Sequence, residues 1–298
     1  MNQYLYIWYQ SPGITEVADN LWFEELKNIG YECGIFTVRG VVFPNISDLT
    51  INNLLSENYT TQYLQRRFTR NGRNYIGNFM SYDVFFQDLR LVNNYDGVDG
   101  LTNSFAAAIW AVEIIMEWTI INGRRIHFFN PMQNASFQSV LGQAPNYNPQ
   151  ALFYGLILAN VVNHYSPYII RPTMTAGTSS SIKVYYLDYW SYFGVLIINK
   201  DTNTSASGNV AVTMSDKTGL HCLYVSASSL SATSGFTFAG YNFIPGTSQP
   251  QGLFKQFEYQ PDSSGVYQVA VNYSQMVFCR TMNTAVNYRT FPRWNKLS

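Results

Sequence analysis

Apolar and polar positions follow two different patterns along this chain, and the change falls near residue 166. In the first part, apolar runs of helical length alternate with short runs typical of strands. We predict strands at residues 4–9, 34–38, 84–92 and 126–129, and helices at residues 17–29, 49–57, 102–121 and 149–162. Such alternation is typical of parallel β/α units, and four strands are half of what a closed (β/α)8 barrel requires.

From residue 167 the runs become shorter and richer in Val, Ile, Tyr and Phe, with Ser, Thr, Gly, Pro and Asn between them. They predict strands at residues 182–187, 194–199, 210–214, 220–225, 236–244, 253–259, 266–271 and 275–279. Strands at this spacing are typical of an antiparallel β-sandwich. The predicted fold is therefore α/β plus all-β: the second half of a (β/α)8 barrel in residues 1–166, then a β-sandwich in residues 167–298.

The clearest element is the helix at residues 102–121. Polar residues that favour a helix start precede it, and Asn122-Gly123 follows its end. Glu113 and Glu117 lie one turn apart in its apolar run, so we interpret it as a core helix and expect no transmembrane segment. Residues 1–12 lack the basic start and apolar core of a signal peptide.

Composition narrows the function classes. Charged residues make up 12% of the chain, and 18 Lys and Arg balance 18 Asp and Glu, which argues against nucleic acid as a partner. Five Asn-X-Ser/Thr sequons favour a glycosylated protein that is secreted or at the cell surface. The sequon asparagines are Asn45, Asn58, Asn134, Asn203 and Asn272.

The three cysteines leave two interpretations open. Cys222 and Cys279 both lie in the β-rich part and are able to pair, which leaves Cys33 as a buried apolar residue. Three unpaired thiols are the alternative. His164 and His221 have no carboxylate or cysteine at a metal-ligand spacing, and the sequence has no glycine-rich phosphate loop, so we expect no metal and no cofactor.

Four segments, in this order and spacing, resemble glycoside hydrolase family 79, the heparanase and β-glucuronidase group. Residues 100–110 (Gly-Leu-Thr-Asn-Ser-Phe-Ala-Ala-Ala-Ile-Trp) resemble the run that follows the nucleophile strand of that family. Residues 125–130 resemble its last barrel strand, residues 147–158 a helix with a Pro…Tyr-Tyr-Gly-Leu pattern, and residues 193–201 a sandwich strand that ends in Asn-Lys-Asp. The resemblance implies the later part of a retaining glycosidase.

Such enzymes use two carboxyl groups about 5–5.5 Å apart, one as the acid and one as the nucleophile. The resemblance places Ser11 at the acid position, and a serine hydroxyl does not replace that acid near neutral pH. The nucleophile position falls near Leu89, with Leu91 or Asp88 as the alternatives. Asp88 is the only carboxylate there, and a strand-end Asp that caps a loop is the competing interpretation.

Other polar residues have a functional and a structural interpretation. Asp83, Asp96 and Asp99 flank the same strand and either bind a sugar hydroxyl or a cation or solvate the loop. His127 either points into a cleft or packs as a core or rim histidine. Four arginines close together in the sequence form either a site for an acidic glycan or anionic partner or a solvated loop. They are Arg66, Arg67, Arg70 and Arg73.

We therefore expect an extracellular glycosidase-like pseudoenzyme with a structural, assembly or glycan-binding role. The missing barrel half would come from a separate chain, an upstream segment or a neighbouring subunit, and homo- or hetero-oligomers are expected because open sheet edges favour pairing. One alternative is an active retaining glycosidase, of the glucuronidase or heparanase kind, that the missing half completes, with Asp88 as nucleophile. Another is a carbohydrate-binding module that uses the tyrosine-rich β-part.

Overall fold

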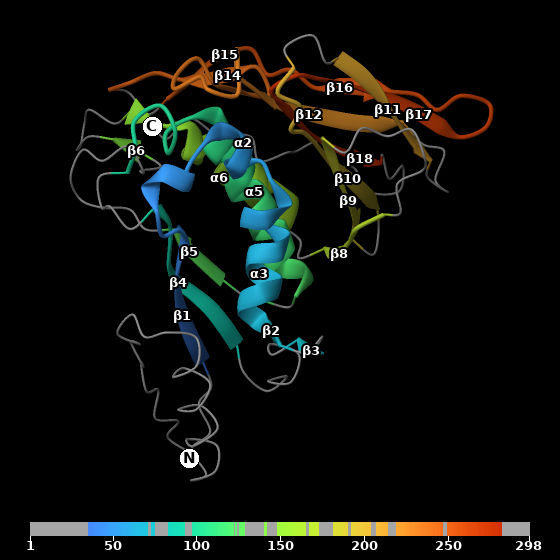
Figure 1. Cartoon of the computed structure of the whole chain (residues 1–298). Helices are drawn as coiled ribbons and strands as arrows, with labels where there is room; N and C mark the ends of the chain where they lie inside the picture. Colours follow the sequence, from blue (N-terminus) through green and yellow to red (C-terminus); the bar gives the residue numbers. More distant parts are fainter. Residues whose placement is uncertain are drawn as a thin grey trace, which may run out of the picture.

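The computed structural model describes most of the chain from Ile35 to Thr281. The described residues are 35–70, 73–74, 83–92, 97–121, 123, 125–128, 140–141, 148–164, 167–172, 181–189, 192–203, 207–213, 219–246 and 249–281. The predicted strand at 4–9 and helix at 17–29 lie outside them, as do Ser11, Cys33, Asp96 and Asn134. The described elements form layers in which helices separate a small parallel sheet from a large antiparallel one (Figure 1).

The parallel sheet has three strands in the order β1-β4-β5. They are β1 (Ile35–Phe43), β4 (Asp83–Val92) and β5 (Arg125–Phe128). All three were predicted, although β1 continues five residues beyond the predicted end at Val38. Both neighbouring pairs are parallel, so the amino ends of the strands share one edge of the sheet and the carboxyl ends the other.

The connection from β1 to β4 contains short helical elements and a hairpin. These are η1 (Ile46–Asp48), α2 (Ile51–Leu54), η2 (Glu57–Tyr59), α3 (Thr61–Phe68), β2 (Thr69–Arg70) and β3 (Arg73–Asn74). The predicted helix at 49–57 is thus α2 followed by the 3-10 turn η2. The sequence did not predict α3, which packs Leu64 into the core.

Two apolar helices, α5 (Phe105–Ile120) and α6 (Ala151–Asn163), form the middle layer, and both were predicted. Thirteen of the 16 residues of α5 are buried, because it is covered on more than one side. At Gly155 the two helices meet so closely that a Cβ atom would lie 2.6 Å from the Ala108 carbonyl oxygen. Among the described residues no helix is long and apolar enough to cross a membrane.

The antiparallel part is a nine-stranded sheet plus the two-stranded ribbon β11–β17. The sheet has the order β15-β14-β13-β12-β18-β10-β9-β8, and β16 also pairs with β12. Its strands are β8 (Tyr168–Ile170), β9 (Ile182–Asp188), β10 (Phe193–Asn199), β12 (Leu220–Ser226), β13 (Thr237–Phe238), β14 (Tyr241–Phe243), β15 (Pro250–Gly252), β16 (Phe257–Tyr259) and β18 (Gln275–Thr281). The ribbon consists of β11 (Ser207–Thr213) and β17 (Val266–Asn272); two further short strands are β6 (Val140–Leu141) and β7 (Asn148–Pro149).

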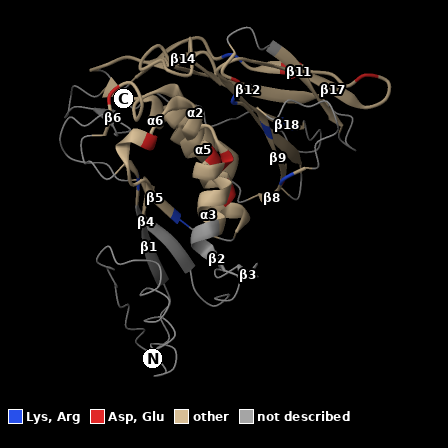
Figure 2. Cartoon of the chain, in the orientation of Figure 1, with Lys and Arg blue, Asp and Glu red and all other residues tan. Residues whose placement is uncertain are grey.

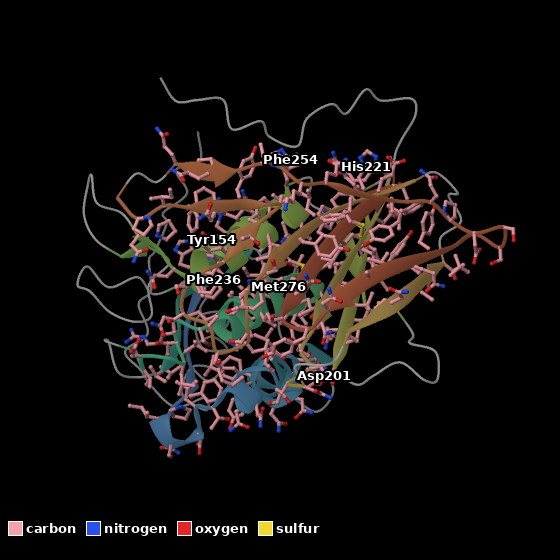
Figure 3. The ribbon with its side chains drawn as sticks, turned by 90° about the horizontal axis from the view of Figure 1, so that it is seen from above. Tyr154, Asp201, His221, Phe236, Phe254 and Met276 are labelled. Atoms are coloured by element: carbon pink, nitrogen blue, oxygen red, sulfur yellow. A yellow bond between two sulfur atoms is a disulfide. The ribbon has the colours of Figure 1, made fainter. Side chains whose placement is uncertain are left out.

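Both faces of the large sheet are covered in its centre. On β10, Leu196 and Ile198 belong to the core shared with α5 and α6, whereas Val195 and Ile197 belong to the core under the ribbon. Figure 3 shows Tyr154 of α6 beside Phe236 of the β-part, with ring centroids 5.3 Å apart. The two parts of the chain therefore share one hydrophobic core.

Two strand predictions were wrong in detail. The strand at 236–244 is a hairpin of β13 and β14, because Ala239 (φ 49°) and Gly240 (φ 81°) adopt left-handed conformations that turn the chain. Of the strand at 253–259 only β16 forms, and Leu253 and Phe254 are exposed.

Cys222 and Cys279 face each other on β12 and β18 and form a disulfide buried under the ribbon. This is the pairing that the sequence offered beside the alternative of three unpaired thiols.

Candidate functional site

The carboxyl edge of the parallel sheet is where a (β/α) barrel keeps its catalytic residues. β1 ends with Val42 and Phe43, and β4 ends with Leu91 and Val92. All four side chains are buried in the core. Leu89, the position nearest the expected nucleophile, is also fully buried. The described strand ends of β1 and β4 therefore present apolar side chains where a catalytic carboxylate would stand.

Asp88 lies inside β4, four residues before its end. Its backbone is in register with Arg39 of β1, at an irregularity of the strand pair. Its side chain is outside the described part, so the prediction that Asp88 is the nucleophile stays a prediction.

The neighbouring acidic residues do not converge on it. Asp83 is the first residue of β4 and so belongs to the opposite, amino edge of the sheet. Asp99 accepts a hydrogen bond from the Asn103 amide at 2.8 Å, which stabilises the loop before α5. The sequence had offered solvation of the loop as the alternative to ligand binding, and binding of a sugar hydroxyl or a cation by Asp99 stays a prediction.

Two of the three histidines are exposed. His127 lies on β5, an outer strand of the described parallel sheet, and its exposure is compatible with a rim position, one of the interpretations that the sequence offered. His164 caps the end of α6.

His221 on β12 lies opposite Glu258 of β16, and its Nε2 is 4.0 Å from the Glu258 carboxylate. Nowhere in the described ranges do three or more potential metal ligands cluster.

Four of the five sequon asparagines are described, and all four are exposed: Asn45, Asn58, Asn203 and Asn272. Two of the sequon hydroxyls have structural roles of their own. Thr60 is buried and donates to Glu113 at 3.0 Å, and Ser274 donates to the Ala227 carbonyl at 2.8 Å. Those two hydroxyls are therefore required by the fold independently of any glycan.

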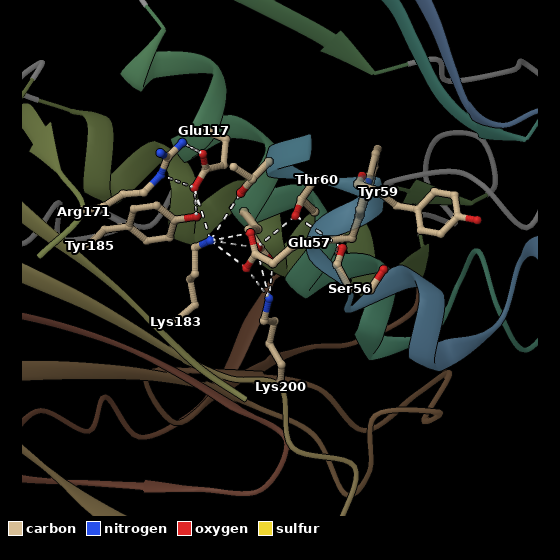
Figure 4. Close-up of polar contacts among 12 residues, drawn as sticks. Ser56, Glu57, Tyr59, Thr60, Glu117, Arg171, Lys183, Tyr185 and Lys200 are labelled. Atoms are coloured by element: carbon tan, nitrogen blue, oxygen red, sulfur yellow. Dashed lines mark hydrogen bonds and ion pairs between the residues drawn. The ribbon is translucent and has the colours of Figure 1, made fainter. Parts of the chain in front are cut away.

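The strongest polar cluster joins the α/β part to the antiparallel part and was missed by sequence reasoning. We call it the buried ionic cluster; Figures 2 and 4 show its position and contacts. It comprises Glu57, Glu113, Glu117, Arg171, Lys183 and Lys200, three acids and three bases, with Tyr185.

Glu57 and Glu113 share two lysines. Lys183 donates to both oxygens of Glu57 at 2.7 Å, and its Nζ lies 3.6 Å from Glu113. Lys200 lies 3.1 Å from Glu57 and 3.1 Å from the nearer oxygen of Glu113. The side chain of Lys200 is 5% exposed and that of Glu57 is 41% exposed, so Glu57 closes the cluster towards solvent.

Glu117 has its own partners. Arg171 donates to both of its oxygens, through Nε at 3.0 Å and through Nη2. The Tyr185 hydroxyl donates to Oε1 at 2.8 Å. A two-point arginine–carboxylate contact is a strong pairing, so Arg171, with the Tyr185 hydroxyl, balances most of the charge of the Glu117 carboxylate.

The environment shifts several pKa values. Burial alone would raise the pKa of Glu57, but the hydrogen bond from Lys183 and the charge of Lys200 outweigh it and lower the pKa to about 2. Burial raises the pKa of Glu113 against the opposing charge of Lys200. Burial would lower the pKa of Lys200, yet the charges of Glu113 and Glu57 raise it.

The cluster is suited to holding elements together rather than to chemistry. Its acids and bases balance, and its most buried carboxylates already have cations and hydroxyls as partners. The sequence signal was the pair Glu113 and Glu117 on one face of an apolar helix. Their cationic partners lie 54 to 87 residues further along the chain, where spacing rules do not reach.

No protein-family model and no curated protein sequence matches the chain. Solved structures do match. A 4-O-α-L-rhamnosyl-β-D-glucuronidase from Fusarium oxysporum 12S has a TM-score of 0.69 at 15% identity, over 84% of this chain and 53% of that one. A GH51 arabinofuranosidase from Xanthomonas axonopodis pv. citri has a TM-score of 0.60 at 11% identity, over 92% and 60%.

A family 44 xyloglucanase from Paenibacillus polymyxa has a TM-score of 0.51 at 6% identity, over 90% of this chain and 50% of that one. The chain thus has a glycoside hydrolase-like fold and spans between half and 60% of the length of these three proteins.

Proposed function

We propose that this chain is a glycoside hydrolase-like pseudoenzyme, of a kind that resembles family 79, and that it acts outside the cell as a structural, assembly or glycan-binding protein. The observation that supports this most is the apolar carboxyl edge of the parallel sheet. Val42, Phe43, Leu91 and Val92 are buried at the described ends of β1 and β4. A retaining glycosidase needs a carboxylate at such a strand end.

The extracellular and glycosylated parts of the proposal are supported by two features. The disulfide between Cys222 and Cys279 is of a kind that persists in oxidising compartments. The four described sequon asparagines are exposed, as glycan attachment requires.

We further propose that the remaining strands of the barrel come from a separate chain or from an upstream segment. The match to 53% of the glucuronidase structure supports this. In the described part, β1 and β5 are the outer strands of the parallel sheet and each has one sheet partner. Outer strands present backbone groups with which a further strand is able to pair.

The test is hydrolysis by the full-length protein, with aryl β-glucuronide and aryl α-arabinofuranoside reporters. We expect rates equal to those of buffer for the wild-type protein and for Asp88→Asn. Asp99→Asn is the matched control, because it removes one carboxylate from a loop position. Turnover that Asp88→Asn abolishes and Asp99→Asn leaves intact would overturn the pseudoenzyme proposal in favour of an active retaining glycosidase.

Assembly is tested separately by sedimentation and by intact mass of the purified material. A co-purifying second chain or a larger oligomer is expected. A monomer of 34.0 kDa in solution would count against an assembly role.

A further inference from the structure

One margin of the nine-stranded sheet is formed by a single stretch of chain, residues 250–259, which we call the outer edge segment. It contains β15, the last strand in the order of the sheet, and β16, whose partner among the described strands is β12. Every residue from 251 to 258 is exposed. The outer edge segment therefore presents a continuous stretch of side chains to solvent.

Three of these exposed residues are large and apolar. Leu253 is 79% exposed, Phe254 44% and Phe257 46%. Figure 3 shows Phe254 and His221 along the same outer margin of the β-part. A sheet edge with exposed apolar side chains is a template for association with another chain, and monomers usually protect such edges.

The backbone of the outer edge segment is held firmly against the rest of the sheet. β15 pairs with β14 and β16 pairs with β12, each through three residue pairs. Between them, the Lys255 N–H donates to the Ala239 carbonyl at 2.8 Å. A Cβ atom at Gly240, where φ is 81°, would clash with the Leu253 carbonyl oxygen. Because an ordered backbone presents these side chains, their association with a partner costs little further ordering.

The two charges on the outer edge segment have opposite signs. Lys255 is exposed, and the side chain of Glu258 is 51% exposed although His221 Nε2 lies 4.0 Å from its carboxylate. A lone lysine on a sheet edge opposes association, whereas a lysine with a nearby acid is able to pair across a twofold axis. When two copies of the segment run past one another in opposite directions about an axis near Phe257, Lys255 of each copy approaches Glu258 of the other. The segment is thus complementary to itself.

The charge of the whole molecule does not oppose contact between two copies. The chain has 18 Lys and Arg and 18 Asp and Glu, and its isoelectric point is about 6.8. Proteins with a net charge near zero lack the repulsion that keeps strongly charged molecules apart.

We propose that the outer edge segment is the contact surface of a homodimer, in which a second copy of this chain packs edge to edge with twofold symmetry. Leu253, Phe254 and Phe257 form its apolar centre, and the two Lys255–Glu258 pairs set the relative orientation. The inference rests on the assembly role proposed above and adds the partner and the surface. Figure 1 shows β15 and β16 on the far side of the helices from the parallel sheet, so this contact leaves β1 and β5 accessible.

The first test is sedimentation equilibrium of the full-length protein over a series of concentrations. We expect the wild-type mass to rise with concentration from 34.0 kDa for one copy to twice that value. Leu253→Gln combined with Phe254→Gln should raise the dissociation constant at least about tenfold, because the contact then buries less apolar surface. The matched control is Tyr168→Gln on β8, at the other end of the sheet, which removes an apolar side chain that is 71% exposed. It should leave the dissociation constant unchanged.

The second test reverses the charges and distinguishes a second copy from any other partner. Lys255→Glu alone and Glu258→Lys alone each replace two attractive contacts by repulsive ones, and each should raise the dissociation constant about threefold to tenfold. The double variant Lys255→Glu/Glu258→Lys restores both pairs with their signs exchanged, so it should return close to the wild-type value. A partner of different sequence would not show this rescue. All substituted residues are exposed, so the unfolding midpoints of the variants should equal that of the wild-type protein.

The proposal is overturned if the wild-type mass stays that of one copy at every concentration, or if Tyr168→Gln weakens association as much as the change at Leu253 and Phe254. Failure of the double charge reversal to improve on the single variants would also overturn it. A different chain that co-purifies without self-association would keep the assembly role and reject the homodimer. Hydrolysis does not enter any of these measurements, so failure here and failure of the pseudoenzyme proposal are distinguishable.

Discussion

Replacement of Lys200 by methionine tests whether the buried ionic cluster holds the two parts of the chain together. The Lys200 side chain is 5% exposed, and its ammonium lies 3.1 Å from both Glu113 and Glu57. Methionine fills a similar volume without charge, so packing should change little. The cost arises because Glu113, which is fully buried, loses its nearest cation.

The magnitude follows from what remains around Glu113. Loss of one partner of a buried ion pair costs about 3–5 kcal/mol. Lys183 at 3.6 Å and the Thr60 hydroxyl at 3.0 Å still contact Glu113, so we expect the lower end of that range, about 3 kcal/mol at pH 7. The loss should shrink as the pH is lowered, because burial raises the pKa of Glu113 and a protonated Glu113 does not need the missing cation.

The assay is equilibrium unfolding by denaturant, followed by tryptophan fluorescence, since Trp110 and Trp118 lie on α5 beside the cluster. The matched variant is Lys200→Met combined with Glu113→Gln, which removes both charges of the pair. It should be more stable than Lys200→Met alone, because no uncompensated carboxylate remains buried.

The reasoning is refuted if Lys200→Met costs less than about 1 kcal/mol at pH 7, the size of an exposed pair. It is equally refuted if the double variant loses as much as the sum of the two single variants, because a real contact must show coupling.

Three further perturbations follow from the same structure. The pKa of Glu57 is lowered from 4.5 to about 2 in the folded chain, so the stability that this carboxylate contributes is complete above about pH 4.5 and is lost as the pH falls towards 2. The unfolding free energy of Glu57→Gln, measured with denaturant between pH 2 and 6, should therefore depend less on pH than that of the wild-type protein. Replacement of both Cys222 and Cys279 by alanine opens a loop with a sequence separation of 57 and should lower the free energy of unfolding by about 2–4 kcal/mol. A wild-type protein with the same unfolding midpoint in reducing and in oxidising buffer would contradict this. Gly155→Ala places a Cβ atom 2.6 Å from the Ala108 carbonyl and should cost about 1–3 kcal/mol by thermal unfolding, whereas an unchanged midpoint would show that the helices separate freely.

Elements whose stability is local were predictable from the sequence. The helix at 102–121 was found as α5 because its apolar run is continuous and ends before Gly123. The helix α3 was missed because it is eight residues long and largely polar, and it depends on Leu64, which packs into a core that the rest of the chain builds. The hairpin at Ala239 and Gly240 was read as one strand because its two-residue turn interrupts an apolar run only briefly.

The candidate site was also predictable from the sequence only in part. The sequence places Glu113 and Glu117 one turn apart in an apolar helix, but it did not indicate Lys200, which lies 87 residues after Glu113. Such pairs depend on how β10 packs against α5, and no local pattern encodes that. The four arginines Arg66, Arg67, Arg70 and Arg73, in contrast, lie close together in the sequence, and the β2–β3 hairpin pairs Arg70 with Arg73.

The layered arrangement covers the helix α5 on more than one side. In a closed barrel the helices need only one covered face, yet 13 of the 16 residues of α5 are buried. The second cover is the large antiparallel sheet, whose Leu196 and Ile198 belong to the same core. If a further chain completes the barrel, as proposed above, the outer strands that the described part offers it are β1 and β5, and on β5 it would meet the exposed Arg125 and His127. Charged and polar side chains on an outer strand disfavour indiscriminate pairing, so such a partner must offer complementary groups as well as a strand.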